Sequence, residues 1–73
     1  MIVKINTEEI KLGQLLKFSG VVGSGSDANY LIKEGLVLLN GEKCTERGKK
    51  IRNNDKVCVF LDEKAEIEVV YEN

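Results

Sequence analysis

Histidine, proline and tryptophan are absent from this 73-residue chain, and aromatic residues make up only 5% of it. Without histidine the chain lacks the most common general base and the most common metal ligand. The two cysteines, Cys44 and Cys58, form no CxxC pair, so the ligands of a tetrahedral zinc site are missing. We therefore expect no metal, no cofactor and no enzymatic activity. The cysteines are expected to be reduced thiols, buried or half-buried.

Long hydrophobic segments are also lacking. No apolar run is long enough to span a bilayer, and the N-terminus has no basic head followed by an apolar stretch, as a signal peptide would. These features favour a cytoplasmic protein with no membrane partner. The length and the 42% hydrophobic content predict one globular domain over residues 1–73. A domain of this size buries only about 60% of its unfolded surface, which favours binding at a surface over catalysis in a deep pocket.

Charge is distributed unevenly along the chain, although the net charge is only −1. Residues 1–60 carry ten basic and seven acidic side chains, whereas residues 61–73 carry one lysine and five acidic side chains. The most basic window, residues 43–52, has five basic side chains and one acidic side chain. Because electrostatic recognition acts over roughly 8–10 Å at physiological salt, the local charge matters more than the total. This distribution predicts a basic face for a polyanion and an acidic final strand on the opposite side.

Two short helices are expected in the first half of the chain. Leucines at helical spacing predict a helix from about residue 12 to 19, which Gly20 ends. Ser24 and Asp27 have the spacing of a capping box, so a second helix is expected to begin there and to end at Gly35. Helices this short are marginally stable alone and must pack against something else.

A small sheet is the expected packing partner. Asn40-Gly41 suits the positive φ angles of a type I′ turn and predicts a hairpin over residues 36–44. Further strands are expected at residues 2–5, 56–60 and 66–71, with 9–11 running back alongside the first and 45–50 forming a polar loop. The expected fold class is α+β, with two short packed helices against a small, mostly antiparallel sheet of about four strands.

Residues 24–41 resemble the core of the S-four RNA-binding domain, also called the αL motif. The family pattern reads S-R-R-x-A-x-x-L-I-x-x-G-x-V-x-V-N-G. The matching positions here are Ser24, Ala28, Leu31, Ile32, Gly35, Val37, Asn40 and Gly41. The flanking segments are similar to further family motifs, so that the resemblance covers about residues 11–60. In length and in the sequence of its motifs the chain is most similar to the short, stand-alone YaaA-type members.

The resemblance implies non-catalytic binding of structured RNA, either ribosomal or transfer RNA. It places the RNA contacts on the first helix, on the start of the second helix and on the basic segment after the hairpin. The residues at those positions are Lys11, Lys17, Ser24, Ser26, Asn29, Lys33, Lys43, Arg47, Lys49, Lys50 and Arg52. We expect a monomer that binds ribosomal RNA during ribosome assembly or on the ribosome, with ribosomal proteins as further partners.

One departure from the family pattern favours an alternative. Gly25-Ser26 stands where the family has two arginines, so two cation contacts are lost, although the helix N-terminus still offers backbone N–H groups to a phosphate. The alternative is a protein-interaction adaptor that has kept the fold and lost most RNA affinity.

Simpler interpretations also stand for single features. The basic loop can be an ordinary solvated surface, and Ser24 can serve only as a helix cap. Tyr30 suits either stacking on bases or packing at the helix edge, while Phe18 and Phe60 are assigned to packing.

Overall fold

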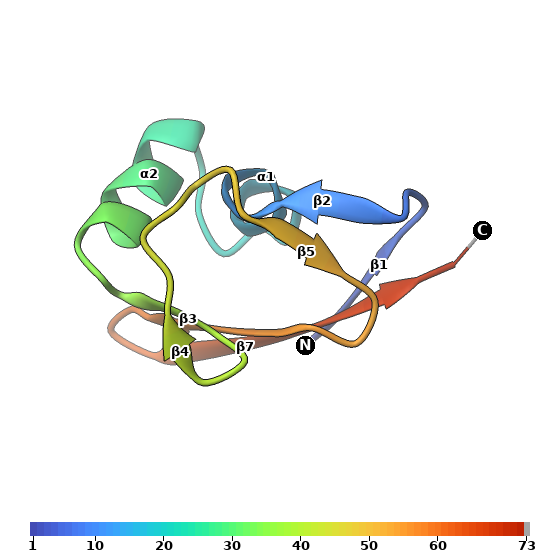
Figure 1. The fold of residues 1–73 in the computed structure, drawn as a ribbon. Helices are drawn as coiled ribbons and strands as arrows, with labels where there is room; N and C mark the ends of the chain where they lie inside the picture. Colours follow the sequence, from blue (N-terminus) through green and yellow to red (C-terminus); the bar gives the residue numbers. More distant parts are fainter. Residues whose placement is uncertain (73) are drawn as a thin grey trace.

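The computed structural model describes residues 1–72 and arranges them in two layers (Figure 1). A five-stranded sheet forms one layer, and two helices together with a two-stranded ribbon form the other. The elements are β1 (Ile2–Ile5), β2 (Glu9–Lys11), α1 (Leu12–Phe18), α2 (Gly25–Lys33), β3 (Val37–Leu39), β4 (Glu42–Lys43), β5 (Lys50–Arg52), β6 (Lys56–Phe60) and β7 (Lys64–Tyr71). The expected α+β class is confirmed. None of these helices is long and apolar enough to cross a membrane.

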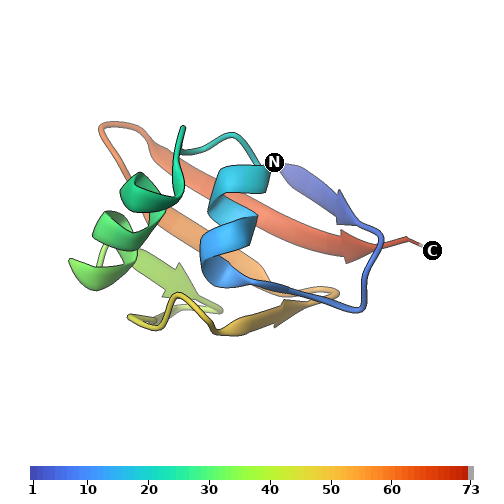
Figure 2. The same ribbon diagram turned by 90° about the horizontal axis from the view of Figure 1, so that it is seen from above.

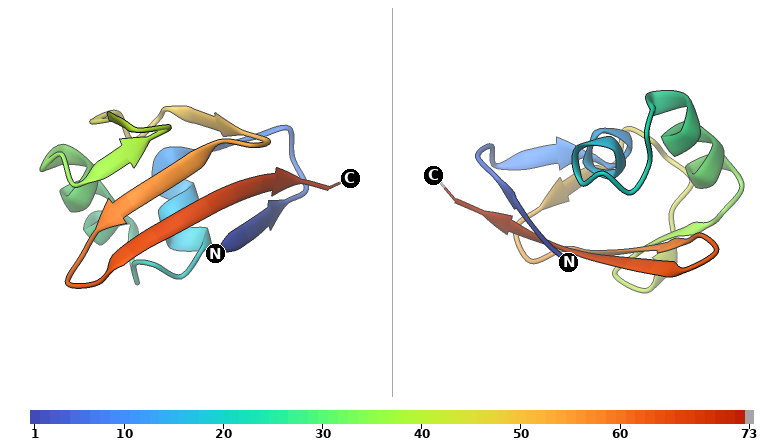
Figure 3. Two further views of the ribbon diagram at one scale, coloured as in Figure 1. Left: turned by 90° about the horizontal axis from the view of Figure 1, so that it is seen from below. Right: turned by 180° about the vertical axis from the view of Figure 1, so that it is seen from behind.

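The large sheet has the strand order β1-β7-β6-β3-β4. β1 runs parallel to β7, and every other neighbouring pair is antiparallel, so the sheet is mostly antiparallel as expected. Viewed from above, α1 and α2 lie over one face of this sheet (Figure 2). Viewed from below, no helix within residues 1–72 covers the other face (Figure 3).

The two-stranded ribbon corrects the expected position of residues 9–11. They do not pair with β1. Instead β2 pairs antiparallel with β5, and Ile10 lies opposite Ile51. Ile51 is fully buried, so it fixes the ribbon to the core. Lys50, assigned above to the end of a loop, is the first residue of β5. Strands of three residues carry too little alternation to be recognised, and the partner of each lies about forty residues away.

One hydrophobic core lies between the two layers. The three leucines of α1 face the sheet, as their spacing predicted. The fully buried large side chains are Leu12, Leu15, Leu16, Ile32, Ile51, Ile67, Val37, Val57, Val59 and Val69. Because helices of seven and nine residues are marginal in water, this packing stabilises both of them.

The predicted helix and turn signals are present. The Ser24 hydroxyl accepts a hydrogen bond of 3.2 Å from the backbone N–H of Asp27, which caps α2. Gly35 follows α2 with a φ of +75°, the left-handed conformation in which glycine ends helices. Asn40 and Gly41 both have positive φ, as a type I′ turn requires.

The aromatic side chains are more exposed than the sequence predicted. Phe18 is 63% exposed and Phe60 is 41% exposed, so their assignment to packing is wrong. Phe18 lies off the leucine stripe of α1, and Phe60 ends β6 on its exposed face. Tyr30 is 61% exposed, which removes the packing interpretation for its ring. Both cysteines are free and half-buried, as expected.

Candidate nucleic-acid interface

The segment after the hairpin is tied by its backbone to the start of α1. The N–H of Leu12 donates to the carbonyl of Lys49 at 2.8 Å, and the N–H of Gly13 donates to the carbonyl of Arg47 at 3.0 Å. These bonds satisfy two of the amides that the first turn of a helix leaves free. Because main-chain atoms make the contact, the side chains of Arg47 and Lys49 remain exposed beside the helix.

The ribbon adds three cations next to this junction. Its isoleucines face the core, so the other side chains of β2 and β5 face outward. Lys11 lies directly opposite Lys50 across the ribbon, and Glu9 lies opposite Arg52. Lys49, Lys50 and Arg52 also line one hollow of 670 Å³. Like charges in directly opposed positions repel each other, so an anion bound between Lys11 and Lys50 would relieve the repulsion.

Glu9 is the carboxylate that partly neutralises the ribbon. Its Oε1 lies 3.5 Å from Nζ of Lys50, and its Oε2 lies 3.3 Å from Nη2 of Arg52. No carboxylate within residues 1–72 lies within 4.0 Å of the charged groups of Lys11 or Arg47. Sequence reasoning missed Glu9, because its role depends on a strand register that the sequence does not reveal.

The second helix meets the same junction through one face. A Cβ placed on Gly13 would lie 3.5 Å from the carbonyl oxygen of Arg47 and 3.8 Å from Oδ1 of Asn29, so these three residues are in close proximity. Asn29, Lys33 and Arg47 line a depression of 250 Å³. Ser26 precedes Asn29 by three residues and Lys33 by seven, so helical spacing places it on the same face.

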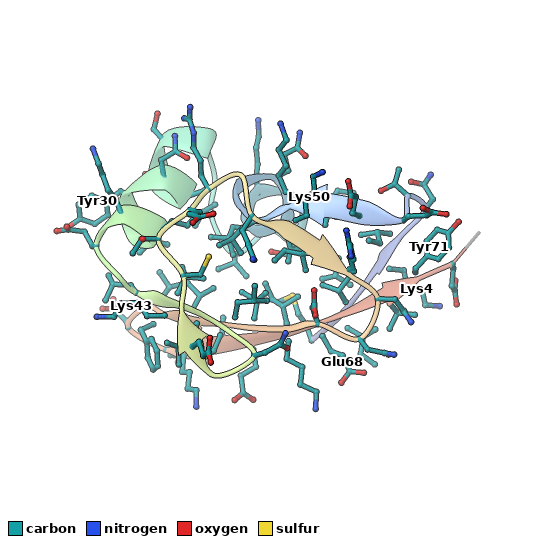
Figure 4. The ribbon with its side chains drawn as sticks, in the orientation of Figure 1. Lys4, Tyr30, Lys43, Lys50, Glu68 and Tyr71 are labelled. Atoms are coloured by element: carbon teal, nitrogen blue, oxygen red, sulfur yellow. The ribbon has the colours of Figure 1, made fainter. Side chains whose placement is uncertain are left out.

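The remaining predicted residues lie in different surroundings. Lys17 is exposed on α1 one turn after Gly13, on the face that meets the junction. The Ser24 hydroxyl is engaged as the cap of α2. Lys43 is separate from the group and lies on β4. Its side chain packs over Gly35, where an added Cβ would lie only 3.1 Å from Cδ of Lys43. Figure 4 shows Lys43 at the edge of the large sheet, away from Lys50. The missing side chain of Gly35 leaves this space for it.

We call the group that the structure brings together the basic platform. It consists of Lys11, Lys17, Ser26, Asn29, Lys33, Arg47, Lys49, Lys50 and Arg52.

The helix layer, residues 6–35 and 44–53, carries seven basic and five acidic side chains. The sheet layer within residues 1–72 carries four basic and seven acidic side chains. The helix layer is therefore net positive and the sheet layer net negative. Across the part of the chain described, no three His, Cys, Asp or Glu side chains gather as a metal site would require.

Comparisons with known proteins agree with this architecture. The family model described as "S4 domain" matches residues 3–70. A probable ribosome maturation protein of Bacillus subtilis is 42% identical over 55 residues, which cover 75% of this chain and 78% of that protein. An uncharacterised RNA pseudouridine synthase of Aquifex aeolicus is 33% identical over 70 residues, which cover 96% of this chain and only 22% of the enzyme. A trimeric structure of heat shock protein 15 from Vibrio cholerae superposes with a TM-score of 0.78 at 18% identity. The superposition covers 90% of this chain and 67% of the other, and it shows a shared fold.

Proposed function

This chain belongs to the S4 domain family, and from that premise we propose that it binds structured RNA through the basic platform, without catalysis. The RNA is ribosomal, and the protein acts in the cytoplasm as a monomeric factor in ribosome maturation or on the ribosome. The name of the Bacillus subtilis relative supports this choice of RNA. Residues 1–73 form one RNA-binding domain in this proposal. The pseudouridine synthase relative is several times longer than the segment it shares, so its activity is not carried over.

The convergence of cations at the start of α1 is the observation that carries the proposal. Two backbone hydrogen bonds and the β2–β5 pairing bring Lys11, Arg47, Lys49 and Lys50 together from segments about forty residues apart. These main-chain contacts fix the backbone positions from which the cations project, which reduces the ordering that phosphate binding requires. RNA helices are recognised mostly by shape and by phosphate and 2′-hydroxyl contacts, which suits a platform rich in lysine and arginine.

Each part of the basic platform has a proposed role. Lys11 and Lys50 bind one phosphate between them, which relieves their mutual repulsion. Arg47 binds a second phosphate together with Lys33 and the Asn29 amide at the depression they share. The remaining cations attract the RNA backbone on either side of these two phosphates. Ser24 caps α2 and also contacts the RNA at the start of that helix. Lys43 lies near the C-terminal end of α2, where a cation is favourable, and does not belong to the basic platform.

A titration of a structured ribosomal RNA fragment at two salt concentrations tests the proposal. The triple variant R47A/K49A/K50A removes three exposed cations of the basic platform. Each lost phosphate contact is expected to flatten the salt dependence, log Kd against log salt, by about 0.7–0.9. The matched variant K4A/K56A/K64A changes the net charge equally, but its lysines are exposed on the sheet layer. It is expected to retain the parent slope. Equal effects of the two variants would show that only net charge matters and would refute the platform.

The adaptor function remains a second candidate because Gly25-Ser26 provides no cations at the start of α2. Affinity purification before and after nuclease treatment separates the two functions. An RNA-binding protein loses its bound ribosomal material when the RNA is digested. An adaptor keeps its protein partner, and that result would favour the second candidate.

A further inference from the structure

Apolar side chains gather at the end of the molecule formed by the β6–β7 turn. Met1, Val21, Phe60 and Leu61, here called the apolar patch, border one open hollow of 670 Å³. Met1 is 59% exposed, and Leu61 is 40% exposed. Phe60 and Leu61 are consecutive exposed hydrophobic residues that share this hollow with Met1 and Val21, and contiguous exposed apolar groups with a polar rim mark interaction sites.

Negative charge borders this hollow. Asp62 and Glu63 belong to its lining. Within residues 1–72, no lysine or arginine nitrogen lies within 4.0 Å of either carboxylate. Lys64, the nearest cation in the sequence, instead pairs with Glu66 at 3.4 Å. The apolar patch therefore has a rim of two carboxylates without ion-pair partners.

The rim determines which occupant fits. A second copy docked by two-fold symmetry would bring both pairs of carboxylates together, and like charges in that position oppose association. RNA and anionic lipid surfaces are repelled for the same reason. A partner that carries apolar side chains next to lysine or arginine fills the hollow and neutralises Asp62 and Glu63.

We propose that the apolar patch docks a basic protein segment whose apolar side chains contact Phe60 and Leu61 while its cations face Asp62 and Glu63. The β6–β7 turn lies at one end of the sheet, away from β2 and β5 (Figures 2 and 3). The segment can thus bind while the β2–β5 part of the basic platform is occupied. This inference does not depend on the RNA-binding function.

An NMR titration of the isotope-labelled protein with a short synthetic peptide tests the proposal. The probe places leucines between lysines, and two control peptides replace either the lysines by glutamate or the leucines by serine. Saturable shift changes are expected at Val21 and at residues 60–65 with the probe only. The variant F60S/L61S is expected to weaken binding at least about tenfold, because it removes apolar area that the peptide buries.

The variant F18S is the matched control. It removes a phenylalanine that is more exposed than Phe60 from α1, outside the hollow, and is expected to leave peptide binding unchanged. F60S/L61S is expected to retain RNA affinity, so a failure of this proposal is distinguishable from a failure of the platform.

Several results would overturn the docking site. These are an absence of saturable shifts at millimolar peptide, equal binding of the glutamate peptide, or unchanged affinity of F60S/L61S. Shifts at the apolar patch that depend on protein concentration without peptide would identify a second copy as the occupant and would also overturn it.

Discussion

Replacing Glu9 by glutamine tests the electrostatics of the basic platform. The carboxylate lies within 3.5 Å of Lys50 and within 3.3 Å of Arg52. A phosphate that contacts either cation would lie roughly 6–7 Å from the carboxylate, given ordinary charge-assisted hydrogen bonds. Two unit charges at that distance repel by roughly 0.6 kcal/mol in water and by more at a protein surface, before screening by salt. We therefore expect E9Q to raise RNA affinity about three- to tenfold at low salt.

The stability of the fold should change little in this variant. Both ion pairs are exposed, with the side chains of Lys50 and Arg52 61% and 69% accessible. Exposed pairs typically contribute about 0–1 kcal/mol to the free energy of unfolding. A change in RNA affinity can therefore be assigned to the interface, and thermal unfolding of both proteins verifies this.

Fluorescence anisotropy with a structured ribosomal RNA fragment is the assay, at low and at physiological salt. The control is E68Q, which changes the charge equally but lies on β7 in the sheet layer (Figure 4). Weaker binding by E9Q would show that Glu9 holds Lys50 and Arg52 in their binding geometry. Equal gains from E9Q and E68Q would show a response to net charge alone. Either result would show that Glu9 does not repel RNA bound at Lys50 and Arg52.

Three further predictions concern the elements that support the site. I51A leaves a cavity at a fully buried position that anchors the ribbon, so it should lower the free energy of unfolding in urea by about 2–5 kcal/mol. A decrease of less than about 1 kcal/mol would contradict that anchoring role. S24A should lower stability by about 0.5–2 kcal/mol. S24D should keep the cap but weaken RNA binding, and unchanged affinity would leave Ser24 as a cap only. G35A should lower the free energy of unfolding by about 1–2 kcal/mol, because Gly35 has a positive φ and an added Cβ would lie close to Lys43. G48A should change it by no more than about 0.5 kcal/mol, because an added Cβ there would have no neighbour within 4 Å. Equal shifts in the thermal unfolding of the two variants would contradict this.

Features specified by neighbouring residues could be predicted from the sequence. Ser24 with Asp27 marks the start of α2, Gly35 marks its end, and Asn40-Gly41 marks the hairpin turn. Each of these signals depends on a few adjacent residues whose backbone conformation has a single strong preference. The leucine spacing of α1 also gave its buried face correctly, because helical periodicity is a local property.

Features that depend on distant pairing could not be predicted. The register that places Lys11 opposite Lys50, and Glu9 between two cations, follows from packing of Ile51 in the core. Lys43 looks like part of the basic segment in the sequence, yet β4 carries it to the other layer. The exposure of Phe18 could not be predicted from its hydrophobic side chain, because many hydrophobic side chains remain at protein surfaces.

In the proposed function, RNA binds the helix layer and leaves the sheet layer free. NMR mapping of the labelled protein with a structured ribosomal RNA fragment tests this most directly. Shift changes are expected to concentrate at residues 11–17, 24–33 and 46–52 and to decrease as salt is raised. Shift changes concentrated on the open face of the large sheet, around Lys56 and Glu68, would contradict it.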